Sequence, residues 1–207
     1  MRLKQCEKSE MTRDKILAAA TDEFAEKGFF GARVDSIAEI SGINKRMIYA
    51  HFESKEKLYS KVLLIAYEWV AECERAYMIE GLDPISSIKN IVSSTFSFLL
   101  ENPRFVRLLM WENLNRARYI PRGELIKLKT PTFDYIKREI QRGKELGVFR
   151  SDVDEHQMVL SLMSFGFAYF SNAYTMSALL GRELTSRDDV IKRSEFIADM
   201  IVKYLTV

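Results

Sequence analysis

Cysteine and histidine are scarce in this sequence of 207 residues, which holds only two of each. Cys6 and Cys73 form no disulfide framework, which favours a reducing compartment. His51 and His156 supply too few ligands for a Cys/His metal cluster. The sequence also lacks H-E-x-x-H, G-x-S-x-G and a glycine-rich phosphate loop. We therefore expect no catalytic residues, no metal site, no cofactor and no enzymatic activity.

A strong charge of one sign is also missing, since 31 Lys and Arg residues face 29 Asp and Glu residues for a net charge of +2. Such a balance attracts neither nucleic acid nor membrane through the overall field, so any charge-based function needs local clusters. Residues 1–10 are polar and basic and show no secretory signal pattern. We therefore expect a cytoplasmic protein.

The segment from His156 to Gly181 contains no charged residue and exceeds the roughly 20 residues that span a bilayer. Serine, threonine and asparagine interrupt it at six positions, including Ser164 and Asn172. No second segment of this kind exists in the chain. These features favour a buried helix over a membrane span, and we expect no membrane association.

Proline is infrequent, and three of the four prolines follow Asp83, Asn102 and Thr130, which are residue types that cap helices. Apolar residues recur at intervals of three and four, and no stretch alternates long enough for a sheet. The chain is therefore predicted to be all-α with about nine helices. Their expected ranges are 12–27, 34–40, 45–51, 55–80, 84–101, 103–118, 122–146 with a break or kink at Pro131, 155–180 and 187–205.

The last two predicted helices are apolar on nearly all sides. A single chain of this size has difficulty covering two such helices, which indicates self-association into a helical bundle. We therefore expect a homodimer. The candidate dimerisation residues are Met163, Phe170, Tyr174, Ile197 and Ile201.

Residues 34–52 have the pattern of a helix, a tight turn and a second helix. Gly42 can adopt the positive φ of the turn, and Asn44 can cap the second helix. Ile37, Ile48 and Phe52, together with Ile43, are expected to point inward. This arrangement is typical of a helix-turn-helix unit.

The second helix of this unit would carry Lys45, Arg46 and Tyr49 on its outer side, with His51 near its end. A recognition helix presents such side chains to the DNA major groove. The guanidinium of Arg46 can pair with guanine, and Lys45 can bind guanine or phosphate. The pattern is short, however, and an ordinary helical hairpin with solvated charges is an alternative interpretation of it.

A longer set of residues closely resembles the DNA-binding domain of the TetR (tetracycline repressor) family of bacterial transcriptional regulators. The resemblance covers about residues 9 to 60, and chain length and the two apolar closing helices also fit that family. The residues that carry it are Thr12 to Ala20, Phe24, Gly28, Phe29, Val34, Ile37, Ala38, Gly42, Ile43, Tyr49, His51, Phe52, Ser54 to Lys57 and Leu58.

This resemblance implies two all-helical domains. A helix-turn-helix DNA-binding domain would span residues 1–55, with residues 1–10 as a flexible basic tail, and an effector-binding and dimerisation domain would span residues 56–207. The homodimer would bind a near-palindromic double-stranded DNA operator, usually as a repressor, and release it when a small-molecule effector binds.

The resemblance also implies roles for individual residues. Thr12 would cap the first helix and contact phosphate, and Lys55 would contact phosphate as well. Arg33 and Asn44 stand where the family often has hydroxyl residues, and Arg46 stands where it commonly has glycine. Arg33 can reach a phosphate by its charge, and Asn44 still caps a helix. The family's operator sequences therefore cannot be transferred to this chain.

Large side chains in the second domain are candidates for an effector site, although most such residues pack interiors. The candidates are Trp69, Phe96, Trp111, Asn115, Phe133 and Phe167. Residues 101–150 hold 12 basic and 6 acidic side chains, an excess of six that suggests an anionic effector such as a carboxylate. A solvated basic face explains this excess equally well.

A helical dimeric interaction scaffold without sequence-specific DNA binding is the main alternative function. It would leave Lys45, Arg46, Tyr49 and Lys55 without a common purpose.

Overall fold

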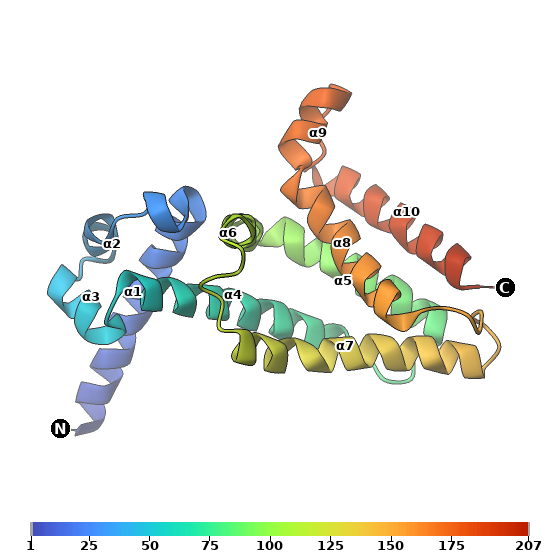
Figure 1. The fold of residues 1–207 in the computed structure, drawn as a ribbon, viewed down its shortest axis with the longest axis horizontal. Helices are drawn as coiled ribbons and strands as arrows, with labels where there is room; N and C mark the ends of the chain where they lie inside the picture. Colours follow the sequence, from blue (N-terminus) through green and yellow to red (C-terminus); the bar gives the residue numbers. More distant parts are fainter. Residues whose placement is uncertain (1, 207) are drawn as a thin grey trace. The chain divides into compact units, whose positions relative to one another are not determined.

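A computed structural model describes the backbone of residues 2–206 and the side chains of residues 9–206. Within this range the chain forms ten α-helices and no β-strand (Figure 1). The helices are α1 (Arg2–Gly31), α2 (Val34–Ser41), α3 (Lys45–Phe52), α4 (Lys55–Tyr77), α5 (Pro84–Glu101), α6 (Pro103–Leu114), α7 (Arg122–Glu145), α8 (Glu155–Ser171), α9 (Ala173–Leu180) and α10 (Arg187–Leu205). The predicted all-α fold is confirmed.

The predicted helix over 155–180 is divided into α8 and α9 at Asn172. The side-chain amide of Asn172 donates to the carbonyl of Ala168 at 2.9 Å, four residues earlier. An asparagine side chain competes in this way with the helical hydrogen bonds of the backbone. Pro131 lies inside α7, so this helix continues without the break that was one of the two predicted outcomes there.

Helix α1 begins at Arg2, ten residues before the predicted start. Residues 2–10, expected as a flexible tail, therefore continue the helix, since this stretch contains neither glycine nor proline. Thr12 accordingly lies inside α1 and not at its N-cap. The backbone leaves the helical conformation at Gly28, with φ 66° and ψ 179°, which agrees with the predicted end at residue 27.

The chain divides into two compact units that do not coincide with the predicted boundary at residue 55. The first unit contains Met1–Tyr67 and Arg107–Leu125, and the second contains Glu68–Val106 and Ile126–Val207. The end of α6 and the connection to α7 thus belong to the unit that carries α1, α2 and α3. The functional boundary at residue 55 stays a prediction.

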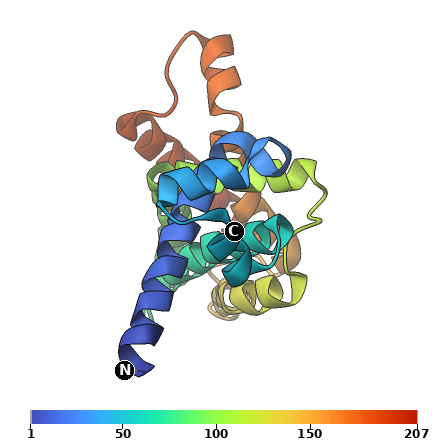
Figure 2. The same cartoon turned by 90° about the vertical axis from the view of Figure 1, so that its left-hand side faces the viewer.

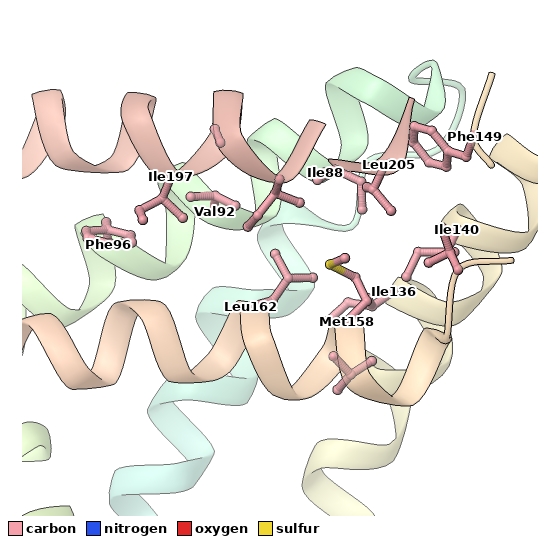
Figure 3. Packing of buried hydrophobic residues seen from close by; sticks show 14 of the residues in the cluster. Ile88, Val92, Phe96, Ile136, Ile140, Phe149, Met158, Leu162, Ile197 and Leu205 are labelled. Atoms are coloured by element: carbon pink, nitrogen blue, oxygen red, sulfur yellow. The ribbon is translucent and has the colours of Figure 1, made fainter. Parts of the chain in front are cut away.

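The core of the second unit forms where α5, α7, α8 and α10 meet (Figure 3). Ile88 and Val92 of α5 pack there with Leu162 of α8 and with Ile197 and Ile201 of α10. Ile197 and Ile201 are 1% and 3% exposed within the single chain. Their predicted place on a dimer face is therefore corrected, because both side chains are used in the protomer's own core.

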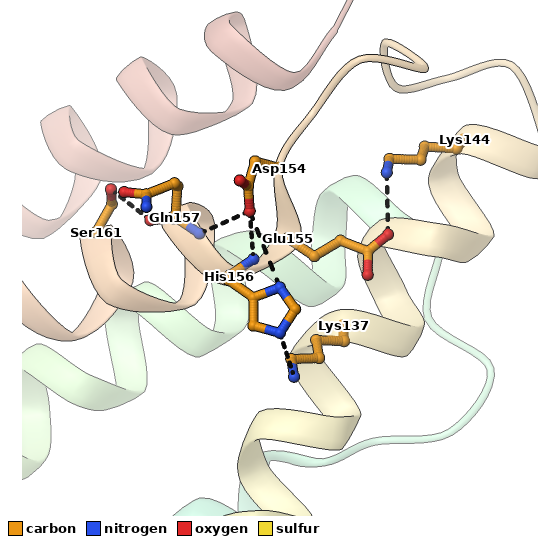
Figure 4. Close-up of polar contacts among 7 residues, drawn as sticks. All are labelled: Lys137, Lys144, Asp154, Glu155, His156, Gln157 and Ser161. Atoms are coloured by element: carbon orange, nitrogen blue, oxygen red, sulfur yellow. Dashed lines mark hydrogen bonds and ion pairs between the residues drawn. The ribbon is translucent and has the colours of Figure 1, made fainter.

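Polar contacts fix the start of α8 beside α7 (Figure 4). The carboxylate of Asp154 caps α8 by accepting from the backbone N–H groups of His156 and Gln157. Glu155 pairs with Lys144 of α7 at 2.9 Å. None of the described helices has an apolar stretch long enough to cross a membrane.

Candidate nucleic-acid interface

Helices α2 and α3 form a helix-turn-helix unit beside α1 (Figures 1 and 2). Gly42 ends α2 in the left-handed conformation, with φ 68°. The Asn44 side chain caps α3 by accepting from the backbone N–H of Met47 at 2.9 Å. Ile48 and Phe52 are buried, as predicted. Capping and burial together fix which face of α3 points to solvent.

The solvent face of α3 carries Lys45, Arg46, Met47 and Tyr49, all of them exposed. The sequence analysis missed Met47, which is 41% exposed. Its signal was its position one residue before the buried Ile48, because successive helical residues are rotated by about 100° and Met47 is therefore turned away from the buried side. Arg46 can pair with guanine edges, while Met47 and Tyr49 can contact thymine methyl groups. The face is suited to reading bases in the major groove.

Lys45 is held by a carboxylate of the neighbouring helix. Its Nζ lies 2.9 Å from Oδ1 of Asp35 in the first turn of α2. This hydrogen bond raises the pKa of Lys45 above its ordinary value. Both side chains are exposed, so the pair adds little stability and lets Lys45 exchange Asp35 for a phosphate or a base.

The buried carboxylate of Glu23 in α1 supports the start of α2. It accepts from the backbone N–H of Arg33 at 3.0 Å and pairs with Lys27 at 2.9 Å. Burial alone would raise the pKa of Glu23, but these hydrogen bonds outweigh it and hold the pKa below its ordinary value. The backbone of Arg33 is thus fixed, while its side chain stays exposed for a phosphate contact.

Lys55, expected to contact phosphate, points inward. Its Nζ donates to the carbonyl oxygen of Ala32 at 2.6 Å and lies 4.8 Å from the ring centroid of Phe29. Burial lowers the pKa of Lys55. This geometry favours a structural role, because Lys55 joins the start of α4 to the segment between α1 and α2.

His51 and Thr12 are less open to solvent than the residues on the outer face of α3. His51 is partly buried at the end of α3, with its ring centroid 6.2 Å from that of Phe52. Thr12 is partly buried within α1 and has a partner of its own. Their DNA contacts remain predictions.

Helix α6 contacts α1 within the first unit through two side chains. The indole Nε1 of Trp111 donates to the carbonyl of Ala25 at 3.3 Å, and Arg107 pairs with Glu26 at 2.5 Å. We call the segment Arg107–Leu125 the clasp. It joins residues from the second half of the sequence to the helix-turn-helix unit.

A buried glutamate shapes the clasp. Glu112 is 1% exposed and accepts from the backbone N–H groups of Tyr119 and Ile120 at 2.7 and 3.2 Å. The ring centroid of Tyr119 then lies 4.2 Å from that of Phe29. Burial, reinforced by the charge of Glu112, raises the pKa of Tyr67 to about 12. The fold therefore keeps this acidic group at the centre of the clasp.

The six effector candidates fall into different units. Trp111 and Asn115 belong to the clasp, and the other four belong to the second unit. Phe96 lies in the core, and Phe133 and Phe167 are partly buried. Trp69 lines a cavity of about 530 Å³ at the turn between α5 and α6. The structure does not gather the six residues into one site.

A buried polar cluster in the second unit escaped the sequence analysis. Lys129 of α7 pairs with Glu74 of α4, and Thr132 donates to the same carboxylate at 2.6 Å. No local sequence pattern indicates this cluster, because the two helices are about 55 residues apart. Both carboxylate oxygens are satisfied, which indicates a structural role.

The remaining dimerisation candidates differ in exposure. Met163 and Tyr174 are exposed, while Phe170 is partly buried and its ring centroid lies 6.0 Å from that of Phe96.

An exposed apolar face, which we call the bundle face, extends over α8 and α10. It consists of Leu160, Met163, Phe196, Met200 and Tyr204.

Comparisons with known proteins agree with this organisation. Residues 16–62 match the family described as bacterial regulatory proteins, tetR family, and residues 84–201 match the tetracyclin repressor-like C-terminal domain. The chain is 29% identical over 202 residues to the transcriptional repressor NicS of Pseudomonas putida, covering 97% of this chain and 95% of that protein. It is 28% identical to the regulator RutR of Escherichia coli K12, covering 84% and 80%.

A solved structure shares the fold. The TetR family regulator PfmR of Thermus thermophilus superimposes with a TM-score of 0.73 at 22% identity, over 94% of this chain and 97% of that one. At this identity the likeness concerns the fold alone.

Proposed function

The chain belongs to the TetR family of bacterial transcriptional regulators, and on this premise we propose that it represses transcription as an operator-binding homodimer released by a small-molecule effector. A repressor meets its operator where the chromosome lies, so we place the protein in the bacterial cytoplasm. Regulation requires binding and release only, and we assign the chain no enzymatic activity.

One observation carries the DNA-binding part of the proposal: the orientation of α3. Its capped start and its buried residues Ile48 and Phe52 turn Arg46, Met47 and Tyr49 outward together. A guanidinium fork beside two apolar contact groups matches the edges of guanine and thymine in the major groove. Because Arg46 replaces the small residue common in the family, we expect it to define this protein's own base preference.

The bundle face supports the homodimer. It places five large apolar side chains in solvent on helices whose opposite sides already form the protomer core. A second copy would cover this face through a two-fold, self-complementary contact. The two α3 helices would then need a separation of about 34–36 Å to enter successive major grooves.

The clasp supports a route for release. An effector changes DNA affinity only if it binds one dimer shape better than another. Because the clasp contains most of α6 and the first residues of α7, a shift of these helices would act directly on Ala25 and Gly28 of α1. We propose that the effector binds in the second unit, with Trp69, Phe96, Phe133 and Phe167 as candidate contacts.

The charge excess gives limited support to an anionic effector. At least six of the twelve basic residues between 101 and 150 form ion pairs with carboxylates of the chain. These six are Arg107, Lys129, Arg138, Arg142, Lys144 and Arg150. The anionic effector therefore stays a prediction that rests on the net charge excess alone.

The experiment is an in vitro selection of genomic fragments by the purified protein, followed by sequencing. We expect enrichment of an inverted repeat, because a symmetric dimer reads two equivalent half-sites. The genes beside it would then guide the choice of effectors to test. Absence of any enriched sequence, with binding that disappears as salt rises, would favour the interaction scaffold instead.

A further inference from the structure

The side chains of Asp35 and Lys45 form an exposed donor–acceptor pair on the helix-turn-helix unit. Asp35 lies in the first turn of α2, and Lys45 is the first residue of α3. Lys45 Nζ lies 2.9 Å from Asp35 Oδ1 and 3.0 Å from Oδ2. The side chains of Lys45 and Asp35 are 49% and 74% exposed, so both charged groups are accessible to a partner.

The position of this pair brings a carboxylate to the surface that faces DNA. The N-terminal residues of a recognition helix contact base edges, and the contact with Lys45 holds the Asp35 carboxylate beside them. A carboxylate at such a place is repelled by the DNA phosphates. Asp35 therefore weakens DNA binding unless its carboxylate meets a hydrogen-bond donor in the groove.

A base pair offers a matching donor and acceptor at its edge in the major groove. In a G·C pair, guanine O6 accepts hydrogen bonds and the cytosine N4 amino group donates them. A base-pairing hydrogen bond joins these two atoms, so they lie about 2.9 Å apart. Lys45 Nζ and Asp35 Oδ1 have the same separation. Because an ammonium has three donors, Lys45 can donate to O6 while it keeps Asp35.

The order of donor and acceptor restricts which base pairs fit. If Lys45 faces a keto base, guanine or thymine, then Asp35 faces the amino group of its partner, cytosine or adenine. With the bases of the pair exchanged, the ammonium meets an amino group and the carboxylate meets a carbonyl oxygen. Both charged groups then lose water without gaining a partner, which is unfavourable.

We propose that Asp35 is a specificity-determining residue, which together with Lys45 requires a keto base on one strand and an amino base on the other at one position of each half-site. A lysine alone binds guanine or phosphate, whereas the added carboxylate rejects the reversed pair. This inference rests on the proposed operator binding and deepens it, because it names the class of base that one position requires.

The test measures the affinity of the full-length protein for its selected operator with each of the four bases placed in turn at every half-site position, in both half-sites together. We expect one position at which G and T give at least about tenfold tighter binding than A and C. Asp35→Asn should reduce this ratio to about one, because an amide can donate as well as accept. Glu39→Gln, at an exposed acid of the same helix, is the matched control and should keep the ratio.

A modified base tests the contact of Asp35 directly. N4-methylcytosine opposite the guanine replaces the amino hydrogen that faces the groove and keeps the base pair. It should weaken binding of the parent protein by about tenfold. It should not weaken binding of Asp35→Ala, because this variant has no acceptor at that place.

Three outcomes would overturn the inference while operator binding stands. The first is an operator without a keto-selective position, and the second is a keto preference that persists in Asp35→Asn. The third is tighter binding of Asp35→Asn to operator and random DNA alike, because Asp35 would then act only by repelling phosphates. A parent protein that selects no operator would instead reject the proposed function, and this inference with it.

Discussion

The indole of Trp111 in α6 lies directly over Gly28 of α1, so that a Cβ at residue 28 would stand 2.6 Å from Trp111 Cδ2. Gly28 also has a φ of 66°, which other residues adopt at a cost. We expect Gly28→Ala to lose about 1–2 kcal/mol through the backbone. Overpacking against the indole adds about 1–3 kcal/mol. Thermal unfolding measures the sum.

Gly31→Ala is the matched control for this prediction. A Cβ at Gly31 would meet only Lys27 Cβ, at 3.3 Å, and the backbone there is not left-handed. We expect a change of less than about 0.5 kcal/mol. Equal stabilities of the two variants would show that Trp111 of the clasp does not exclude a Cβ at residue 28.

Lys55 is predicted to stabilise the fold more than it binds DNA. Lys55→Met removes the hydrogen bond to Ala32 and should lower the free energy of unfolding by about 1–2 kcal/mol. The salt dependence of DNA binding should stay unchanged, because the ammonium points inward. Lys57→Met is a control at an exposed lysine two residues later. A flatter salt dependence for Lys55→Met at unchanged stability would instead establish a phosphate contact.

Glu23 makes stability depend on pH in the acid range. Its pKa is lower in the folded chain than in the unfolded chain, where it is about 4.3. The ionised group therefore stabilises the fold above that pH, and this contribution disappears as pH falls through the lowered pKa. We expect Glu23→Gln to be less stable than the parent at pH 7 and the difference to shrink between about pH 4 and pH 3.

Thermal unfolding of both proteins across pH 3 to 7 measures this effect of Glu23. Glu39→Gln provides the same charge change at an exposed site and should leave the profile of the parent unchanged. A Glu23→Gln deficit that persists undiminished at pH 3 would contradict the account.

Neighbouring residues of α10 should separate dimerisation from folding. Met200 lies on the bundle face, whereas Ile201 is 3% exposed in the core. Met200→Asp should yield a folded monomer in sedimentation with an unchanged helical spectrum. Ile201→Asp should lose more than about 4 kcal/mol of stability, because it buries a charge without a partner. A Met200→Asp variant that remains dimeric would reject the bundle face.

Arg46 should determine base preference. Arg46→Ala should weaken binding at one operator position by about 1–3 kcal/mol and relax selectivity there. Binding of the variant to a set of operators substituted at single positions measures this loss. Equal losses on operator and random DNA would instead show that Arg46 contacts only phosphate.

The helix-turn-helix unit was predictable because its determinants are local. Gly42 and Asn44 specify the turn and the cap by their own conformational preferences, and the alternation of buried and exposed residues in α3 follows helical spacing. Each of these signals lies within a few residues of its effect. The orientation of Arg46 therefore followed from the sequence.

Other features depend on partners that are distant in the sequence. Helix α10 is apolar on several sides, so its spacing could not decide whether Ile201 or Met200 enters the core. The contact of Trp111 with Gly28 joins residues 83 positions apart, and no local pattern indicates it. The inward position of Lys55 could not be predicted for a similar reason. Its hydrogen-bond acceptor, the carbonyl oxygen of Ala32, comes close to it only in the folded chain.

The central claim is that two copies of α3 read a symmetric sequence. Its most direct measurement compares the affinity of the protein for a selected inverted repeat with that for a shuffled sequence of equal composition, at one physiological salt concentration. We expect a ratio of at least about 10³ and two chains per DNA duplex. A ratio near one, or a single chain bound, would contradict the account.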